Sequence, residues 1–159
     1  MRPSLLRRKI IRPILDLLRQ GITPEKIALS IALGITLGVT PALGSTSLLC
    51  LLAAVLLRLN LPAIQLVNYL VYPLQFALLV PFIRAGEWIF AAQPVRFSLA
   101  QILDLIRADT WTAIATLWTA TMHALVAWLA LGSLASLLIY ALLTPALRRL
   151  GESLRGESQ

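Results

Sequence analysis

The sequence predicts an all-α, polytopic helical membrane protein, and three observations carry this prediction. Hydrophobic residues make up 58% of the 159 residues and charged residues only 13%, which is more apolar than an ordinary soluble domain. Three stretches contain no charged residue, namely 27–57, 59–83 and 110–147, and each exceeds the roughly 18 residues typical of a membrane-spanning segment. They lack the alternation of barrel strands, so we expect helices that satisfy their own backbone groups.

Residues 1–20 are predicted to form a basic amphipathic helix at the membrane surface, because apolar side chains recur at helical spacing from Ile11 to Leu18. A solvated basic arm is the alternative. Seven of the fourteen Lys and Arg residues lie in the first 26 positions, beside the first apolar stretch. The net charge of +7 therefore indicates a membrane-proximal segment rather than a nucleic-acid-binding surface.

Residues 24–57 are predicted to form a helical hairpin broken by proline and glycine. Thr23 can cap the first helix and Pro24 can begin it. Pro41 removes a backbone donor and Gly44 can adopt a left-handed turn, so the helix should break here. The two arms reach about 20 Å each, too short for a core of roughly 30 Å. A re-entrant hairpin fits these lengths, and a kinked crossing is the alternative.

Small residues recur at every fourth position of the first arm, at Ser30, Gly34 and Gly38. They share one helix face, which another helix backbone can approach closely. We interpret this face as a helix-packing surface rather than as a ligand site.

A second broken segment is predicted at 61–91, where Pro73 and then Pro81 interrupt the apolar stretch. Two broken segments in succession are typical of a binding site at membrane depth. Neighbouring helices that absorb the kinks are the alternative. A far-side loop with a surface helix should follow at 92–109, between Trp88 and Trp111, which suit the membrane interface.

The third long segment, 110–147, would measure about 57 Å as a straight helix. It must tilt, extend beyond the lipid or break near Gly132, and a fourth membrane segment stays open. The end of the chain, 151–159, is predicted to be a disordered cytoplasmic tail. A re-entrant hairpin would keep Arg58 and the Arg148 and Arg149 pair beside the basic amino terminus, so both termini would be cytoplasmic.

Residue types suited to catalysis are scarce. All seven carboxylates lie outside the three uncharged stretches, so no acidic relay is expected at membrane depth. With one histidine, His123, and one cysteine, Cys50, we predict neither a metal site nor a cofactor. No catalytic triad or nucleotide-binding loop is apparent. We therefore predict a protein that is not an enzyme, with His123 serving helix packing.

An anion site is the remaining chemical possibility. Ser45, Thr46 and Ser47 follow the glycine turn and would begin a half-helix, whose free amides and positive end attract a phosphate. Ser45 acting only as a cap is the alternative. Arg58 can pair with an anionic headgroup or simply extend to the interface. The candidate substrate-binding residues are Gly44, Ser45, Thr46, Ser47, Arg58, Asn60, Asn68, Tyr72 and Gln75.

The pattern TPEKIALSIALGITLGVTPALGSTSLLCLLAAVLLRLNLPA, followed by NYLVYP, resembles the bacterial membrane family known as domain of unknown function 2062. The resemblance covers Gly21 to Gly86. Its most specific parts are the TP start, the G-x-x-P-x-x-G break and the R-x-N-x-P junction. It implies a small protein of the bacterial inner membrane, sometimes joined to glycosyltransferase-like domains, and it supplies no activity.

These observations lead us to expect a small inner-membrane transporter or lipid translocase for a substrate with a phosphate or another anionic headgroup. Its partners would be membrane lipids, including polyprenyl phosphate, and further copies of the chain, because so few crossings cannot close a substrate path. The alternative is a membrane scaffold that anchors envelope glycan or lipid enzymes, with a glycosyltransferase as a possible partner. A membrane enzyme that borrows catalytic groups from a partner ranks third.

Overall fold

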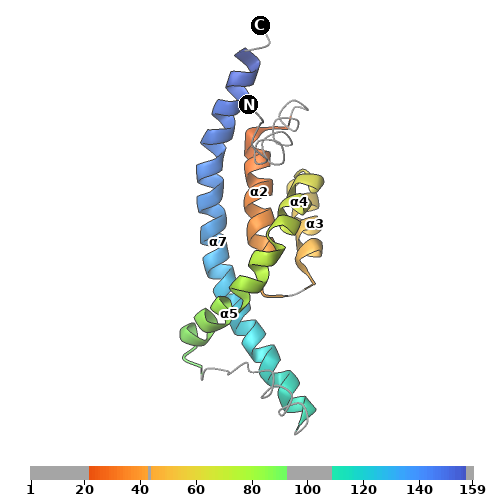
Figure 1. Ribbon diagram of the computed structural model, residues 1–159, viewed down its shortest axis with the longest axis vertical. Helices are drawn as coiled ribbons and strands as arrows, with labels where there is room; N and C mark the ends of the chain where they lie inside the picture. Colours follow the sequence, from red (N-terminus) through yellow and green to blue (C-terminus); the bar gives the residue numbers. More distant parts are fainter. Residues whose placement is uncertain (1–21, 43, 93–108, 157–159) are drawn as a thin grey trace, which may run out of the picture.

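The computed structural model describes residues 22–42, 44–92 and 109–156. These residues form helices and, within the described ranges, no strand, so the prediction of an all-α fold is confirmed. The helices are α2 (Pro24–Gly38), α3 (Thr46–Leu57), α4 (Leu61–Leu70), α5 (Tyr72–Ile89) and α7 (Thr110–Gly156). Figure 1 shows α2 between the long α7 and the shorter α3 and α4, with α5 crossing α7 at the lower end of α2.

The first two helices form a hairpin. Thr23 Oγ1 accepts the Lys26 N–H at 3.4 Å and Pro24 begins α2, as the sequence predicts. After Gly38 the chain leaves the helix, and Gly44 has φ +86°. Pro41 has no N–H to donate to the Leu37 carbonyl, and the Thr40 N–H occupies that carbonyl instead, at 3.3 Å. The chain then reverses, and α3 runs back alongside α2 (Figure 1).

The next two helices form a bent pair. Asn60 caps α4, because its Oδ1 accepts the Ala63 N–H at 2.8 Å. α4 and α5 are separated by Val71 alone and their axes are bent by 64°. Pro73 lies in the first turn of α5, whereas Pro81 lies inside α5 without ending it. Of the two prolines predicted to interrupt this segment, only Pro73 therefore stands at a break.

The last helix, α7, is continuous over 47 residues. The break considered near Gly132 does not occur, and the helix extends about 70 Å at about 1.5 Å per residue. Asp109 caps its start, since the carboxylate accepts the N–H groups of Trp111 at 2.9 Å and Thr112 at 3.3 Å. The expected disordered tail is instead helical as far as Gly156, because the end of α7 still packs beside the start of α2.

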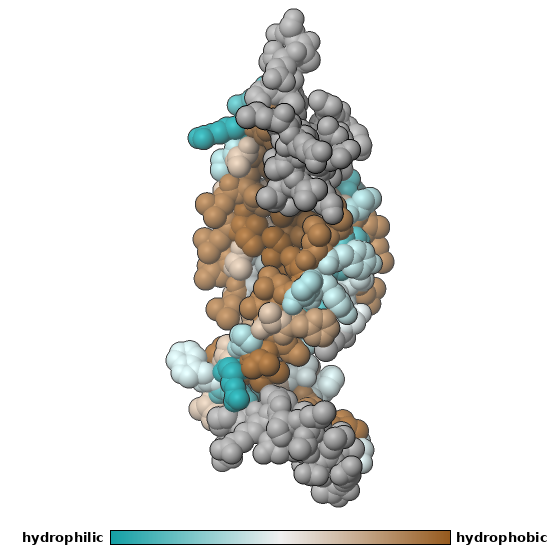
Figure 2. Space-filling view, in the orientation of Figure 1, coloured by the Kyte–Doolittle hydropathy of each residue, from teal (hydrophilic) through white to brown (hydrophobic). Residues whose placement is uncertain are grey.

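One described helix is long and apolar enough to cross a membrane, over Thr110–Glu152, and the bent pair of α4 and α5 can supply a second span. α3 is apolar but has only 12 residues. Large apolar side chains are exposed along α3, α4, α5 and α7. Figure 2 shows such side chains gathered across the middle of one face, with hydrophilic side chains near its two ends. The protein is therefore helical with a membrane-compatible surface.

Apolar clusters and close glycine contacts hold the helices together. Ile27 and Ala28 of α2 pack against Leu147 of α7. A Cβ added at Gly34 would lie 2.8 Å from Val67 Cβ, and one at Gly86 would lie 2.4 Å from backbone atoms of His123. The predicted small-residue face of α2 is thus covered by α4 of the same chain. The segments predicted at 1–20 and at 93–108 lie outside the described residues.

A buried polar cluster at the helix breaks

The broken end of α2 is held by side chains from two other helices. In a continuous helix the Thr36 carbonyl would accept the Thr40 N–H, but that N–H is turned to Leu37. Trp128 of α7 takes its place, with its indole N–H donating to the Thr36 carbonyl at 2.8 Å. Gln75 of α5 donates its Nε2 to the Thr40 carbonyl at 2.9 Å. The carbonyls of Thr36 in α2 and of Thr40 just beyond it are therefore satisfied by side chains.

Hydrogen bonds fix which way the nearby amide side chains point. Gln75 must turn its nitrogen to the Thr40 carbonyl, which can only accept. Gln65 likewise turns its nitrogen to the Ser47 carbonyl at 2.9 Å, so its Oε1 is left as an acceptor. Asn68 Nδ2 donates to that Oε1 at 3.2 Å and to Ser47 Oγ at 3.4 Å. The side-chain oxygens of Asn68 and Gln75 are consequently the atoms that accept no hydrogen bond.

Three oxygens in this cluster are buried without a hydrogen-bond partner: Thr40 Oγ1, Asn68 Oδ1 and Gln75 Oε1. Their residues are 0%, 1% and 0% exposed. Their residues meet where α2 ends, because Gln75 bonds the carbonyl of Thr40, two residues beyond α2, and a Cβ at Gly38 would lie 3.0 Å from Asn68 Oδ1. Leaving a buried polar group unpaired costs about 1–3 kcal/mol. We refer to Thr40, Asn68 and Gln75 as the oxygen cluster.

Several helix ends meet at the oxygen cluster. The cluster lies at the carboxyl end of α2, where the helix dipole places roughly half a negative charge. The last turn of α2 contains no basic residue. No group of three or more His, Cys, Asp or Glu residues that could hold a metal ion occurs in the described part of the chain. The cluster therefore offers neutral oxygen acceptors between the carboxyl ends of α2 and α4 and the amino ends of α3 and α5.

Three predicted site residues meet at these breaks, and three others lie around the turn. Asn68, Gln75 and Ser47 belong to or contact the oxygen cluster. Gly44 is exposed and Thr46 is buried at the start of α3. The Ser45 side chain does not cap α3, because its hydroxyl donates to the Ala42 carbonyl at 2.8 Å. Ser45 occupies the N-cap position of α3, but without a side-chain cap hydrogen bond.

The remaining predicted residues lie away from the oxygen cluster. Arg58 ends α3, exposed and with φ 52°, at the opposite end from Ser45 to Ser47. The twelve residues of α3 separate the two ends by about 18 Å, so Arg58 and the turn do not form one pocket. Asn60 serves as the cap of α4. Tyr72 is exposed and packs edge-on against Phe76 at 5.3 Å.

Residues outside the predicted set complete the cluster. Thr40, Gln65 and Trp128 are not among the predicted site residues. Gln65, Asn68 and Gln75 follow one another at spacings of three and seven residues, which would place them on one face of a continuous helix. That polar stripe within an apolar stretch was the available signal for Gln65. Nothing in the sequence pairs Trp128 with α2.

His123 lies at the contact between α5 and α7. Its ring stacks on Phe90 with centroids 4.4 Å apart, and Gly86 is pressed against its backbone. Nearby on α5, Glu87 is buried and forms an ion pair with Arg84 at 2.9 Å. This environment supports the predicted packing role of His123.

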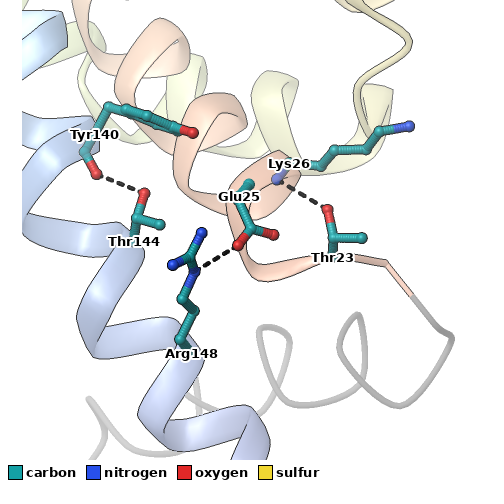
Figure 3. Close-up of polar contacts among 6 residues, drawn as sticks. All are labelled: Thr23, Glu25, Lys26, Tyr140, Thr144 and Arg148. Atoms are coloured by element: carbon teal, nitrogen blue, oxygen red, sulfur yellow. Dashed lines mark hydrogen bonds and ion pairs between the residues drawn. The ribbon is translucent and has the colours of Figure 1, made fainter.

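A second polar region joins the start of α2 to the end of α7. Figure 3 shows the Arg148 guanidinium directed at the Glu25 carboxylate, and Nε and Oε1 are 2.6 Å apart. Hydrogen bonds from backbone N–H and from Arg148 lower the pKa of Glu25. Lys26, Arg58, Arg148 and Arg149 are exposed at this end, where α2 and α4 begin (Figure 1). We call these four residues the basic end.

The chain belongs to the bacterial family called domain of unknown function 2062, described as an uncharacterized protein conserved in bacteria. The family model matches residues 7–153, well beyond the stretch that carries the resemblance in the sequence. No curated protein and no solved structure matches the chain. The family is bacterial, and its description names no activity.

Proposed function

We propose that the protein is a small membrane transporter or lipid translocase whose polar substrate passes the two helix breaks. The observation that carries this proposal is the oxygen cluster, a set of buried and unpaired acceptors inside a molecule with an apolar exterior. Broken helices that expose polar atoms at membrane depth are the usual form of a transport site. Buried polar atoms without partners are rare where a fold serves stability alone.

The hairpin geometry supports a re-entrant arrangement in the bacterial inner membrane. α3 runs back to the end of the molecule at which α2 begins. The bent pair of α4 and α5 then runs away from that end, and α7 returns to it. In this arrangement the basic end faces the cytoplasm, as the distribution of Lys and Arg prefers. Both termini are then cytoplasmic, and the turn at 39–45 is buried partway across the lipid. Further copies of the chain would enclose the substrate path.

The basic end supports an anionic substrate. Arg58 is exposed, has no ion-pair partner among the described residues and stands where two short helices meet. Exposed Arg and Lys side chains near a membrane surface attract phosphate-bearing headgroups. Arg58 would thus collect a headgroup at the cytoplasmic surface, and the helix breaks would provide its polar passage. The half-helix amides near Ser47 remain the proposed contact for the phosphate inside.

Vesicle assays test this proposal directly. Purified protein is reconstituted into vesicles that contain a fluorescent phosphatidylglycerol or a fluorescent phosphatidylcholine, and the fraction exposed to an external quencher is followed. We expect protein-dependent movement of the anionic lipid. Arg58→Asn should slow it at least tenfold, because asparagine tolerates the left-handed backbone but has no charge. Arg58→Lys, which keeps the charge, should retain more of the rate. Rates equal to those of protein-free vesicles would refute the proposal.

The scaffold function is the second candidate, and one observation favours it. Between residues 129 and 142, α7 exposes several leucines, namely Leu129, Leu131, Leu134, Leu137, Leu138 and Leu142. Such a face suits lipid or another apolar helix. The face of Gly34 and Gly38 does not serve this purpose, because α4 already covers it. A scaffold would therefore lose co-purifying proteins when these leucines, rather than the glycines, are replaced by larger aromatic residues.

A further inference from the structure

We propose that the oxygen cluster binds a monovalent metal cation such as Na⁺ through Thr40 Oγ1, Asn68 Oδ1 and Gln75 Oε1. All three atoms are buried and unpaired, and two of them have their orientation fixed by the hydrogen bonds of the adjoining nitrogens. A ligand here must present positive charge or hydrogen-bond donors. The amide oxygens do not titrate in the accessible pH range, so a proton alone does not satisfy them.

Two helix carboxyl ends, of α2 at Gly38 and of α4 at Leu70, contribute to the position of the cluster, beside the amino ends of α3 and α5. Residues 38–40 stand at the negative end of the α2 dipole, and no basic side chain occupies the last turn of that helix. Cation sites of transporters are built in this way, from the carboxyl ends of half-helices and from unwound backbone at membrane depth. Water is the competing occupant, since a buried water typically makes about three hydrogen bonds.

The ligand set favours a monovalent ion. Ca²⁺ and Mg²⁺ sites normally include carboxylates, whose charge offsets that of the ion. The oxygen cluster consists of two amides and a hydroxyl, and the described carboxylates lie elsewhere: Glu25 at the start of α2, Glu87 near the end of α5, and Asp109 and Glu152 near the two ends of α7. Neutral oxygens match one positive charge without leaving a large excess of either sign.

The cation site and the transport function are separable. Binding of the ion follows from the geometry of the oxygen cluster alone, whereas a role in driving substrate movement rests on the proposed function. An ion held between α2, α4 and α5 would tie both helix breaks together. If substrate movement requires the breaks to open, ion release and substrate movement would be coupled. Equilibrium ion binding, measured without any transport, therefore tests the present proposal by itself.

The experiment compares the thermal unfolding of the full chain in detergent in NaCl and in choline chloride at equal ionic strength. We expect NaCl to raise the melting temperature in a saturable way, as a ligand specific for the folded state does. Thr40→Val removes the hydroxyl with little change of shape and should weaken the apparent Na⁺ affinity at least tenfold. An identical melting temperature in the two salts would overturn the proposal and indicate that water satisfies the cluster.

Thr36→Val is the matched control. Thr36 is buried on α2, four residues before Thr40, but its hydroxyl already donates to the Ala32 carbonyl at 2.9 Å. This variant should keep the Na⁺ response, and an equal loss in both variants would overturn the assignment. Sodium NMR of the wild-type protein needs no variant. Broadening beyond that of empty detergent supports the site, and its absence counts against it.

Discussion

The two polar regions of this chain, the basic end and the helix breaks, differ in how their polar side chains find partners. At the basic end, Glu25 and Arg148 are partly exposed and pair with each other across two helices. At the helix breaks, the polar side chains are withdrawn from solvent, and three of their oxygens have no partner. Water can replace the first set of contacts at little expense, because exposed ion pairs contribute weakly. The second set lies away from solvent, so an unpaired oxygen there costs about 1–3 kcal/mol.

The difference separates two kinds of helix contact within one small helical fold. The contact between α2 and α7 depends on apolar burial around Ile27, Ala28 and Leu147. The exposed ion pair between Glu25 and Arg148 adds little stability to it. At the broken end of α2, Gln75 of α5 and Trp128 of α7 add hydrogen bonds to backbone carbonyls. Substitutions in the two regions should therefore differ in the size of their effect on stability and in whether that effect depends on the proposed ion.

The largest effect is expected from Gly38→Ala. A Cβ at this position would lie 2.5 Å from Val71 Cγ2 and 3.0 Å from Asn68 Oδ1, so α2 and α4 must separate. Overpacking of this kind costs about 1–3 kcal/mol. We expect a lower melting temperature and loss of the response to NaCl, measured in the same unfolding assay.

Gly151→Ala is the matched change at the other region. Its Cβ would be 3.9 Å from Pro24 Cγ, an ordinary contact. Alanine inside a helix is favoured over glycine by about 0.5–1 kcal/mol, so this variant should be slightly stabilised and keep its ion response. Equal destabilisation of both variants would mean that the two regions do not differ.

A smaller effect is expected from Gln75→Met, which keeps the shape of the side chain but removes the amide. The Thr40 carbonyl loses its donor, while the unpaired Oε1 disappears as well. The net loss should be about 1 kcal/mol in choline chloride. In NaCl the difference from wild type should grow, because only the wild type gains from the ion. Leu74→Met, on the exposed face of α5, should show neither change.

The smallest effect is expected from Glu25→Gln at the basic end. Because the pKa of Glu25 is lowered in the folded protein, its ion pair adds stability above the unfolded pKa of about 4.3. That contribution is lost as the pH falls through the folded pKa. Wild type and variant should differ slightly at pH 7 and converge in acid, as melting curves across pH would show. A difference that grows in acid would contradict this interpretation.

The sequence predicts much of this architecture because the determining features are local. Pro41, Gly44 and Pro73 act on their own backbone, and Thr23 and Pro24 define a helix start within four residues. The length of α7 was harder to predict, since glycine at position 132 is compatible with either a break or a close contact with Trp128.

The candidate site is less predictable because its contacts are remote in sequence. The bond from Trp128 to Thr36 spans 92 positions and that from Gln75 to Thr40 spans 35. No local pattern encodes such pairs. The grouping of Arg58 with Ser45 to Ser47 relied on nearness along the chain, but a helix of twelve residues places its two ends far apart.

The central claim is that the hairpin enters and leaves the membrane on one side, which puts the oxygen cluster at membrane depth. The most direct test is labelling of single cysteines with a membrane-impermeant reagent in oriented membranes, in a Cys50→Ala background. The account predicts that Arg58→Cys and Arg149→Cys react from the cytoplasmic side and Trp111→Cys from the other. Reaction of positions 58 and 111 from the same side, opposite to 149, would contradict it.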